Sequence, residues 1–489
     1  MNAQNIMASG FKGLVSTGMI AMLVACGGGG GRSDDNAVTS VPVVARGVIT
    51  QLGSIWVNGV EYETPNGNSY ASDDSISTVA DYKVGQFVRI RGRRNANGIS
   101  GIADEVEYEA EIEGAADGNG DINGVVIMRT PNTNAPGIPD PLSNGIRYEV
   151  SGIWVNDTTI EATFIKVDDD GDGIDEIKGF VQAVVPGISL TVHGVVYSYG
   201  GPTVVSAGDF VEVHFTGTVA SMVEFEDEFN DDNEGQEVEF EGAVNLDPVD
   251  LATCPAGADF LIDATCIDWD SVPASGWMDG LADELDMVSG IRVEAEGHFN
   301  AAGLLIAEKI KGRGNRVRVS ATVDAGSIGA GTFTVFDSIV AVTTQAGLTE
   351  YDNLANFNAI TDNAGLEIRG IRTGPGSMLA LRIKAESVAA DKHKLRAEVD
   401  ENGANSGNST ITVMGVTSQA GSGTELELND AIFTGGLNTF LDLIDDDNIV
   451  NTTNGPRDVV EMRFDVTTGD GSSVDPYAAD EIEIEEEDD

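Results

Sequence analysis

The chain has 489 residues, which is enough for about three ordinary domains or for a larger number of small ones. Its 81 Asp and Glu against 27 Lys and Arg give a net charge of −54, which disfavours binding to nucleic acid phosphates and to anionic lipid headgroups. Because 41% of the residues are hydrophobic, the composition supports packed cores and excludes a simply disordered acidic chain.

The N-terminus has the features of an export signal. Residues 1–25 contain one base, Lys12, and no acid, and an apolar stretch runs from Leu14 to Ala25. This stretch is too short to cross a hydrocarbon core of about 30 Å, but it suits a signal-peptide h-region. The following Leu23-Val24-Ala25-Cys26 resembles the bacterial lipobox, in which the chain is cut before the cysteine and the sulfur receives diacylglycerol. We therefore expect residues 1–25 to be a lipoprotein signal peptide and Cys26 to be lipidated; an ordinary secretory signal with an incidental cysteine is the alternative.

A glycine run follows the predicted lipidation site. Gly27–Gly31 and the polar residues after them are typical of a flexible tether, which we assign to residues 26–44. Each buried CH₂ of an acyl chain contributes about 0.8 kcal/mol, so two or more chains anchor stably. Gly27, not Asp, follows Cys26, and by analogy with enteric lipoproteins this implies outer-membrane sorting in a Gram-negative cell. The expected location is the bacterial cell envelope, with membrane contact through the N-terminal lipid.

Two patterns recur along the body. The first is a hairpin, exemplified by SIWVNGVEYE at residues 54–63, in which Asn58-Gly59 supplies the positive φ angles of a type I′ turn. The second is a strand, a Gly- or Asn-containing turn and another strand. Hairpin copies lie at 54–63, 189–198, 332–341 and 410–419, and strand–turn–strand copies at 83–109, 206–226, 288–312 and 363–386, with diverged versions at 144–167 and 455–486.

These repeats predict an all-β tandem array of about six small units. A unit of about five short strands suits a closed OB-like barrel, whose closure removes exposed strand edges. One or two large sandwiches with coincidental similarity are the alternative. The units are assigned to residues 45–113, 114–178 with an Asp-rich loop, 179–235, 236–315 with a cysteine pair, 316–391 and 392–489 with an acidic tail.

The first unit carries a family resemblance. GVITQLGSIWVNGVEYET at 47–64 and VADYKVGQFVRIRGR at 79–93 resemble the bacterial repeat family called domain of unknown function 5666. Members are often lipoproteins with tandem copies. The family has no established activity, so the resemblance implies an organisation and no chemistry.

The sharpest candidate for a binding site is an Asp-rich loop, VDDDGDGIDEI at residues 167–177. Calcium needs six to eight oxygens from a turn that wraps it, and this spacing resembles the calcium loops of dockerin and thrombospondin type-3 repeats. It departs from an EF-hand because Gly179 stands where a bidentate Glu belongs. The sequence therefore predicts a Ca²⁺ site, and a solvated acidic hairpin tip is the alternative. The predicted ligands are Asp168, Asp170, Asp172, Asp175 and Glu176.

Charged residues elsewhere are expected to be structural. Acids alternate with apolar residues at 105–113, 237–241 and 481–485, which puts every Glu on one strand face. We expect these faces to be solvated; a weak surface for divalent cations or a cationic partner is the alternative. The basic cluster at 308–319 is expected to pair with acidic strands of the same chain, rather than with nucleic acid or lipopolysaccharide.

The remaining two cysteines, Cys254 and Cys266, are 12 residues apart. Two thiols alone bind zinc poorly, and an exported protein reaches an oxidising compartment. We therefore expect a disulfide between them.

Catalysis finds no support in the sequence. The four histidines are scattered, His193 occupies the hairpin position of Asn58, and no GxSxG, HExxH, P-loop or GxGxxG pattern occurs. The leading hypothesis is a non-enzymatic, acidic, membrane-anchored lipoprotein that serves as a structural, adhesion or binding module of the envelope. A module that binds a glycan or a cationic peptide is the main alternative, and a hydrolase with dispersed carboxylates is the remote one.

Overall fold

The computed structural model describes residues 40–485 with gaps, and these residues belong to one compact unit. The predicted signal peptide and Cys26 lie outside the described residues. The first strand begins at Ser40, so residues 40–44, which the sequence assigned to the tether, pair with other strands instead. Gaps in the description cover 66–68, 73–77, 109, 169–172, 227–236, 264, 280, 282, 390–391, 429–430, 442 and 445–458.

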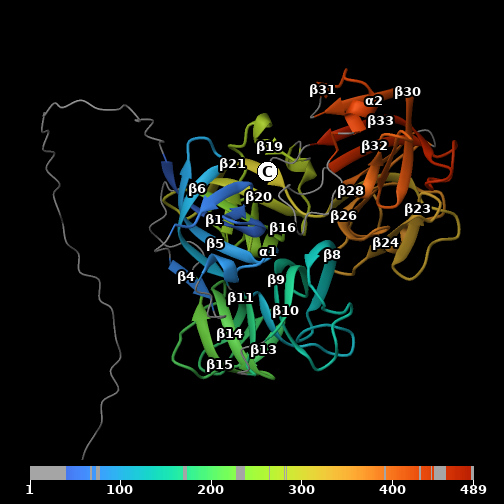
Figure 1. The fold of residues 1–489 in the computed structure, drawn as a ribbon. Helices are drawn as coiled ribbons and strands as arrows, with labels where there is room; N and C mark the ends of the chain where they lie inside the picture. The colour runs from blue at the N-terminus through green and yellow to red at the C-terminus, as the bar shows by residue number, and fades with distance from the viewer. Residues whose placement is uncertain are drawn as a thin grey trace, which may run out of the picture. The chain divides into compact units, whose positions relative to one another are not determined.

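Strands make up nearly all of the regular secondary structure of the described chain, and they form three sheets (Figure 1). The first sheet contains β1 (Ser40–Leu52), β2 (Ile55–Val57), β3 (Val60–Glu63), β4 (Ser69–Ser72), β5 (Phe87–Asn95), β6 (Ser100–Tyr108), β16 (Glu237–Asn245), β17 (Phe260–Ile262), β18 (Thr265–Asp268), β19 (Trp277–Met278), β20 (Arg292–Phe299) and β21 (Leu305–Gly312). The second contains β7 (Ile112–Ala115), β8 (Val126–Asn134), β9 (Arg147–Asn156), β10 (Thr159–Val167), β11 (Asp175–Val185), β12 (Ser189–Val192), β13 (Val195–Ser198), β14 (Phe210–Thr216) and β15 (Val219–Phe225).

The third sheet and the few short helices complete the fold. This sheet contains β22 (Arg316–Thr322), β23 (Thr332–Val335), β24 (Val340–Thr344), β25 (Glu350–Asp352), β26 (Gly365–Gly374), β27 (Ser377–Ala385), β28 (His393–Asn405), β29 (Thr410–Val413), β30 (Val416–Leu428), β31 (Ala431–Ile432), β32 (Val459–Asp465) and β33 (Tyr477–Glu485). The helices are α1 (Pro248–Leu251) and α2 (Leu437–Leu441), with 3-10 turns η1 (Val79–Asp81), η2 (Ala274–Gly276), η3 (Glu284–Asp286) and η4 (Phe357–Ala359).

One strand order recurs within these sheets. β1, β2, β3, β6 and β5 close into a five-stranded ring, in which the first strand pairs with the second and fourth, and the third runs parallel to the fifth. The same closed order occurs in β11–β15, in β16–β18 with β20 and β21, and in β28–β30 with β32 and β33. This is the order of an OB-type barrel. The prediction of an all-β fold built from small five-stranded barrel units is confirmed.

Two further copies keep this order but close through isolated bridges. In β7–β10 the second strand is reduced to Ile122, which bridges Ala116 and Val125. In β22–β27 the first and second strands meet only through Val323 and Val335. The first strands of these two copies are short, with four residues in β7 and seven in β22, against thirteen in β1. They therefore offer little backbone with which the hairpin can pair.

The copies are joined through their first strands. β1 runs parallel to β16, with residues 43–46 opposite 237–240. β7 pairs with β11 through Ile112 and Ile177, and β22 pairs with β28 through residues 318–320 and 394–396. Backbone hydrogen bonds therefore connect copies that are neighbours in sequence in two cases and distant in the third.

The hairpin turns have the backbone that the Asn-Gly pattern predicts. Asn58 and His193 have φ of 55° and 47°, and each is followed by a glycine with positive φ. Each side chain also reaches back to its first strand: Asn58 Nδ2 donates to the Arg46 carbonyl at 3.2 Å, and His193 Nε2 lies 2.7 Å from the Lys178 carbonyl. Gly47 and Gly179 stand there because a Cβ would lie about 2 Å from these side chains.

Apolar side chains fill each ring and also the space between copies. Inside the first barrel Tyr62 and Tyr108 are fully buried. A separate cluster combines Val155, Val288 and Leu381, which come from three different copies. Because burying such a side chain stabilises by roughly 1.5–3 kcal/mol, these contacts make the copies parts of one packed structure.

Candidate functional site

The Asp-rich loop connects β10 to β11, and an arginine occupies its described part. Arg147, at the start of β9, contacts Asp168 through Nε at 2.6 Å and Asp175 through Nη1 at 2.5 Å. Asp170 and Asp172 lie outside the described residues. Two of the five predicted calcium ligands therefore converge on a guanidinium, which supplies positive charge at the place where the prediction puts the ion.

Glu113 on β7 joins the same group. Arg147 Nη2 lies 2.8 Å from Glu113 Oε1, and strand register places Arg147 directly opposite Ala115. Burial raises the pKa of Glu113 to about 8, with a contribution from Asp168 and with Arg147 opposing. The sequence does not reveal Arg147 as part of this group, because Arg147 lies about 20 residues before the loop. Only the pairing of strands brings its side chain to the loop.

The fifth predicted ligand, Glu176, contacts a histidine. Glu176 on β11 is the register partner of His214 on β14, and its carboxylate lies 2.7 Å from His214 Nδ1. The carboxylates of Glu176 and Glu212 raise the pKa of His214 to about 10. The histidines are scattered in the sequence, but this one lies among carboxylates in the fold.

Another charged centre links barrel copies through Arg46 on β1. This side chain is buried and contacts Glu111 at 3.3 Å and Asp263 at 2.5 Å, which belong to two other copies. Its guanidinium also lies over the rings of Phe87 and Phe240, with distances of 4.6 and 5.1 Å to the ring centres. Because removing one partner of such a buried group leaves the others uncompensated, Arg46 is a structural link. It also lines a half-open cavity of about 40 Å³.

The acidic strand at 237–241 differs from its prediction. Glu239 and Glu241 on β16 are buried rather than solvated, and β16 lies between its paired strands β1 and β20. Arg94 on β5 contacts Glu239, and Arg292 Nε contacts Glu241 at 2.5 Å. Period-two alternation shows which side chains share a face but not what covers that face.

The basic cluster at 308–319 pairs within the chain, as predicted. Lys309 lies 2.9 Å from Glu296, Lys311 lies 3.3 Å from Glu294, and Arg313 lies 2.9 Å from Glu294. These acids are on the neighbouring strand β20. The cluster therefore neutralises buried carboxylates of its own barrel.

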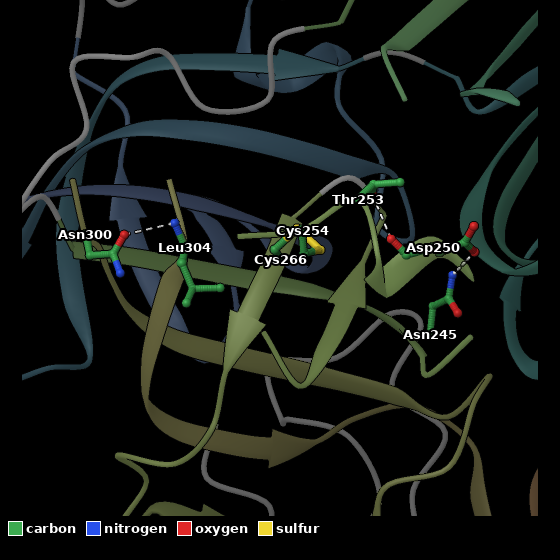
Figure 2. The surroundings of a disulfide bond; sticks show 7 residues. All are labelled: Asn245, Asp250, Thr253, Cys254, Cys266, Asn300 and Leu304. Carbon is green, nitrogen blue, oxygen red and sulfur yellow. Dashed lines mark hydrogen bonds between the residues drawn. A yellow bond between two sulfur atoms is a disulfide. The ribbon is translucent and has the colours of Figure 1, made fainter. Parts of the chain in front are cut away.

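Cys254 and Cys266 are joined by a disulfide, with their Cα atoms 5.7 Å apart (Figure 2). The bond connects the segment after α1 to β18. Hydrogen bonds fix the start of this segment, because Asn245 donates to the Asp250 carboxylate at 2.8 Å and Thr253 donates to the Asp250 carbonyl at 2.7 Å. The disulfide therefore holds an insertion against the barrel.

Helices of the described chain are short, and none has the length and apolar character needed to cross a membrane. A search of curated proteins finds no match to this chain. The family model named Domain of unknown function (DUF5666) matches it twice, at residues 46–107 and 318–384. These segments cover the first barrel and the copy formed by β22–β27. Two copies of the barrel therefore match this family model, which confirms the resemblance seen in the first unit.

Proposed function

We propose that this chain is a lipid-anchored, non-enzymatic module of the bacterial cell envelope that acts as a structural spacer or binding scaffold. The observation that supports it most is the pairing of first strands, which joins barrel copies by backbone hydrogen bonds instead of linkers. An array joined in this way holds the surfaces of its barrel copies at defined separations from one another. The net charge of −54 keeps the array soluble and favours cationic partners.

The charged groups inside the molecule also favour a structural role. Arg46, Arg94 and Arg147 each contact two or more carboxylates that come from different segments of the chain. The cavities beside Arg46 and beside Arg369 are small, at about 40 Å³ each. Neither of these two is large enough to enclose a substrate, since ligand pockets commonly have several hundred Å³.

The anchor is tested by expressing the full-length chain in a Gram-negative host. We expect mass spectrometry of the mature N-terminal peptide to show a diacylglyceryl group on Cys26, and the protein to fractionate with outer membranes. Cys26→Ser should abolish both results. The matched control, Cys254→Ser with Cys266→Ser, removes the other cysteines and should retain the lipid. A soluble, unacylated mature protein would contradict the proposal.

The scaffold role and the alternatives are separated by binding. Titration against a glycan array and a panel of cationic peptides should give only weak, salt-sensitive binding to the peptides if the chain is a spacer. A single glycan bound with salt-independent affinity would instead favour the ligand-binding alternative. Hydrolysis of that glycan would favour an enzyme.

Calcium stabilisation forms part of the proposal, because Asp168 and Asp175 lie close enough to share one cation, Arg147. We expect Ca²⁺ to raise the melting temperature relative to chelator, with about 2.7 kcal/mol gained at a hundredfold excess over Kd. The triple change of Asp168, Asp170 and Asp172 to Ala should lose this response. Identical melting temperatures with Ca²⁺ and with chelator would show that Arg147, without Ca²⁺, neutralises these carboxylates.

A further inference from the structure

A compact group of ligand-type side chains lies on the outer face of the β11–β15 barrel. His214 and Glu212 are two residues apart on β14 and therefore share a face, and Glu224 is the register partner of Glu212 on β15. One ligand atom from each of the three residues lies within 4.8 Å of the others. The group is held by one small sheet, so its geometry depends on local strand pairing.

The imidazole is aimed into this group. The His214 side chain is only 12% exposed, and its Nε2 is buried with no hydrogen-bond partner. The nearest carboxylate oxygens are Glu224 Oε2 at 3.4 Å and Glu212 Oε2 at 3.5 Å. Both separations exceed the usual range for an N–H···O hydrogen bond. Nε2 therefore contacts these two carboxylates as ion pairs and not through hydrogen bonds of normal length.

These separations match those of atoms that share a metal ion. Zn²⁺ binds His nitrogen and carboxylate oxygen at about 2.0–2.2 Å, so two ligands of a tetrahedral ion lie roughly 3.3–3.6 Å apart. The distances from Nε2 to the two carboxylates fall within this range. Glu224 is half exposed, which leaves room for water as a fourth ligand.

A fourth residue holds the imidazole in place. Glu176 on β11 contacts His214 Nδ1 at 2.7 Å, which leaves Nε2 to face the group. A carboxylate on the distal nitrogen is the usual arrangement for a metal-binding histidine, because it sets the tautomer and the orientation of the ring. Glu176 therefore has the place of a positioning residue, not of a ligand.

Other acidic groups in the described part of the chain lack this combination. Asp259 with Asp268 and Asp270, and Glu427 with Glu481 and Glu483, contain carboxylates alone. Hard cations prefer such all-oxygen groups, whereas imidazole favours zinc and its neighbours in the first transition row. The imidazole of His214 therefore distinguishes this group chemically from the two groups that contain carboxylates alone.

We propose that Glu212, His214 and Glu224 form a binding site for a divalent transition metal of the Zn²⁺ class, with Glu176 positioning His214. The site goes beyond the scaffold role, and its ligands lie on β14 and β15, outside the Asp-rich loop, although Glu176 is also one of the predicted calcium ligands.

The test uses the full-length chain with Cys26→Ser, since the other two cysteines are in the disulfide. Titration with ZnCl₂ in a calorimeter should show one tight equivalent, and CaCl₂ at the same concentrations should not compete. Substitution with CoCl₂ should give the intense visible absorption of a tetrahedral ion. His214→Gln should weaken Zn²⁺ binding by at least a hundredfold, and Glu212→Gln or Glu224→Gln by at least tenfold.

Two variants separate a metal site from general effects. His298→Gln is the matched control, because His298 is an exposed histidine that also contacts a carboxylate, Glu308 at 3.2 Å; it should leave Zn²⁺ affinity within twofold. Glu176→Gln should weaken Zn²⁺ binding by roughly 10–100-fold and shift the Co²⁺ spectrum, while the variant remains folded in EDTA.

Three results would overturn the proposal. They are the absence of a stoichiometric Zn²⁺ equivalent in the parent chain, equal affinity in the parent and in His214→Gln with both folded in EDTA, and equal losses in His214→Gln and His298→Gln. The last would indicate nonspecific binding to the acidic surface.

Discussion

The two segments that match the DUF5666 model share a barrel frame and differ on the outer face of the first strand. In the first copy, Val44 on β1 faces Arg91, which precedes a bulge at Gly92. In the second copy, Arg318 on β22 faces Arg369, which precedes a bulge at Gly370. Val44 and Arg318 therefore occupy equivalent positions in the two copies. Two residues further along each strand, Arg46 of the first copy is equivalent to Ser320 of the second.

The residues that contact the outer face of the first strand also differ between the two copies. Arg46 is the register partner of Arg89 on β5 and binds acids of two other copies, whereas Arg318 of the second copy is the register partner of two arginines, Arg369 on β26 and Arg396 on β28. Like charges in register repel. Asp286 at 2.6 Å and Glu367 at 2.9 Å from Arg369 offset this repulsion around a cavity of about 40 Å³. The shared strand order and bulge glycines thus define the barrel, while a few outward-facing residues determine which segments pack against it.

The largest effect should come from Arg46→Ala. Its removal leaves Glu111 and Asp263 without their shared partner, and we expect the free energy of unfolding to fall by about 3–5 kcal/mol. Urea denaturation measures this loss, and Ser320→Ala in the second copy should stay within about 0.5 kcal/mol. Equal losses in the two variants would remove the distinction between the copies.

The bulge glycines should respond alike in both copies. A Cβ on Gly92 would lie 2.1 Å from the Ile102 carbonyl oxygen, and one on Gly370 would lie 2.0 Å from that of Leu379. We expect Gly92→Ala and Gly370→Ala each to destabilise by about 2 kcal/mol. Gly421→Ala is the control, because a Cβ there meets open space. A neutral result at either bulge would show that the frame is not shared.

The hairpin turns should differ in how they respond to substitution. Asn58→Ala should cost about 1–2 kcal/mol, because alanine disfavours a φ of 55°, and Asn58→Gly should cost less. In the second copy the turn is tied down by Asp324, which accepts hydrogen bonds from the Ser338 amide and the Thr334 hydroxyl, each at 2.7 Å. Asp324→Ala should therefore cost about 1–2 kcal/mol. Thermal melts of the three variants test whether Asn58→Gly is less destabilising than Asn58→Ala and Asp324→Ala.

The smallest effect concerns pH. Burial raises the pKa of Glu239, beside the first copy, to about 8, although Arg94 opposes this. Its folded pKa thus exceeds the unfolded value of about 4.3, so its stabilising contribution is complete below pH 4.3 and is lost as pH rises towards 8. Glu239→Gln should flatten the stability profile between pH 5 and 8.

Beside the second copy the sign reverses. Burial would raise the pKa of Glu461, but Lys394 and Arg463 lower it, so its contribution is present above pH 4.3 and is lost as pH falls. Glu461→Gln should therefore lower stability at pH 7 and have little effect near pH 3. Parallel profiles for Glu239→Gln and Glu461→Gln would contradict the contrast.

Local patterns in the sequence determined the strands, the turns and the class of fold. Alternation with a period of two identifies strands, and Asn58-Gly59 identifies a type I′ hairpin, because both depend on residues adjacent in the chain. The repetition of these patterns predicted five-stranded barrel units. Neighbouring residues carry this information, so no tertiary contact was needed to infer it.

Only the tertiary structure decided which faces are covered and which charged groups meet. Arg147 reaches Asp175, and Glu176 reaches His214, through strand pairing between segments that the local pattern does not connect. Glu239 is buried because β1 pairs with β16, nearly 200 residues further along the chain. Register across strands fixes these contacts, and register is a property of two segments together, which neither segment encodes by itself.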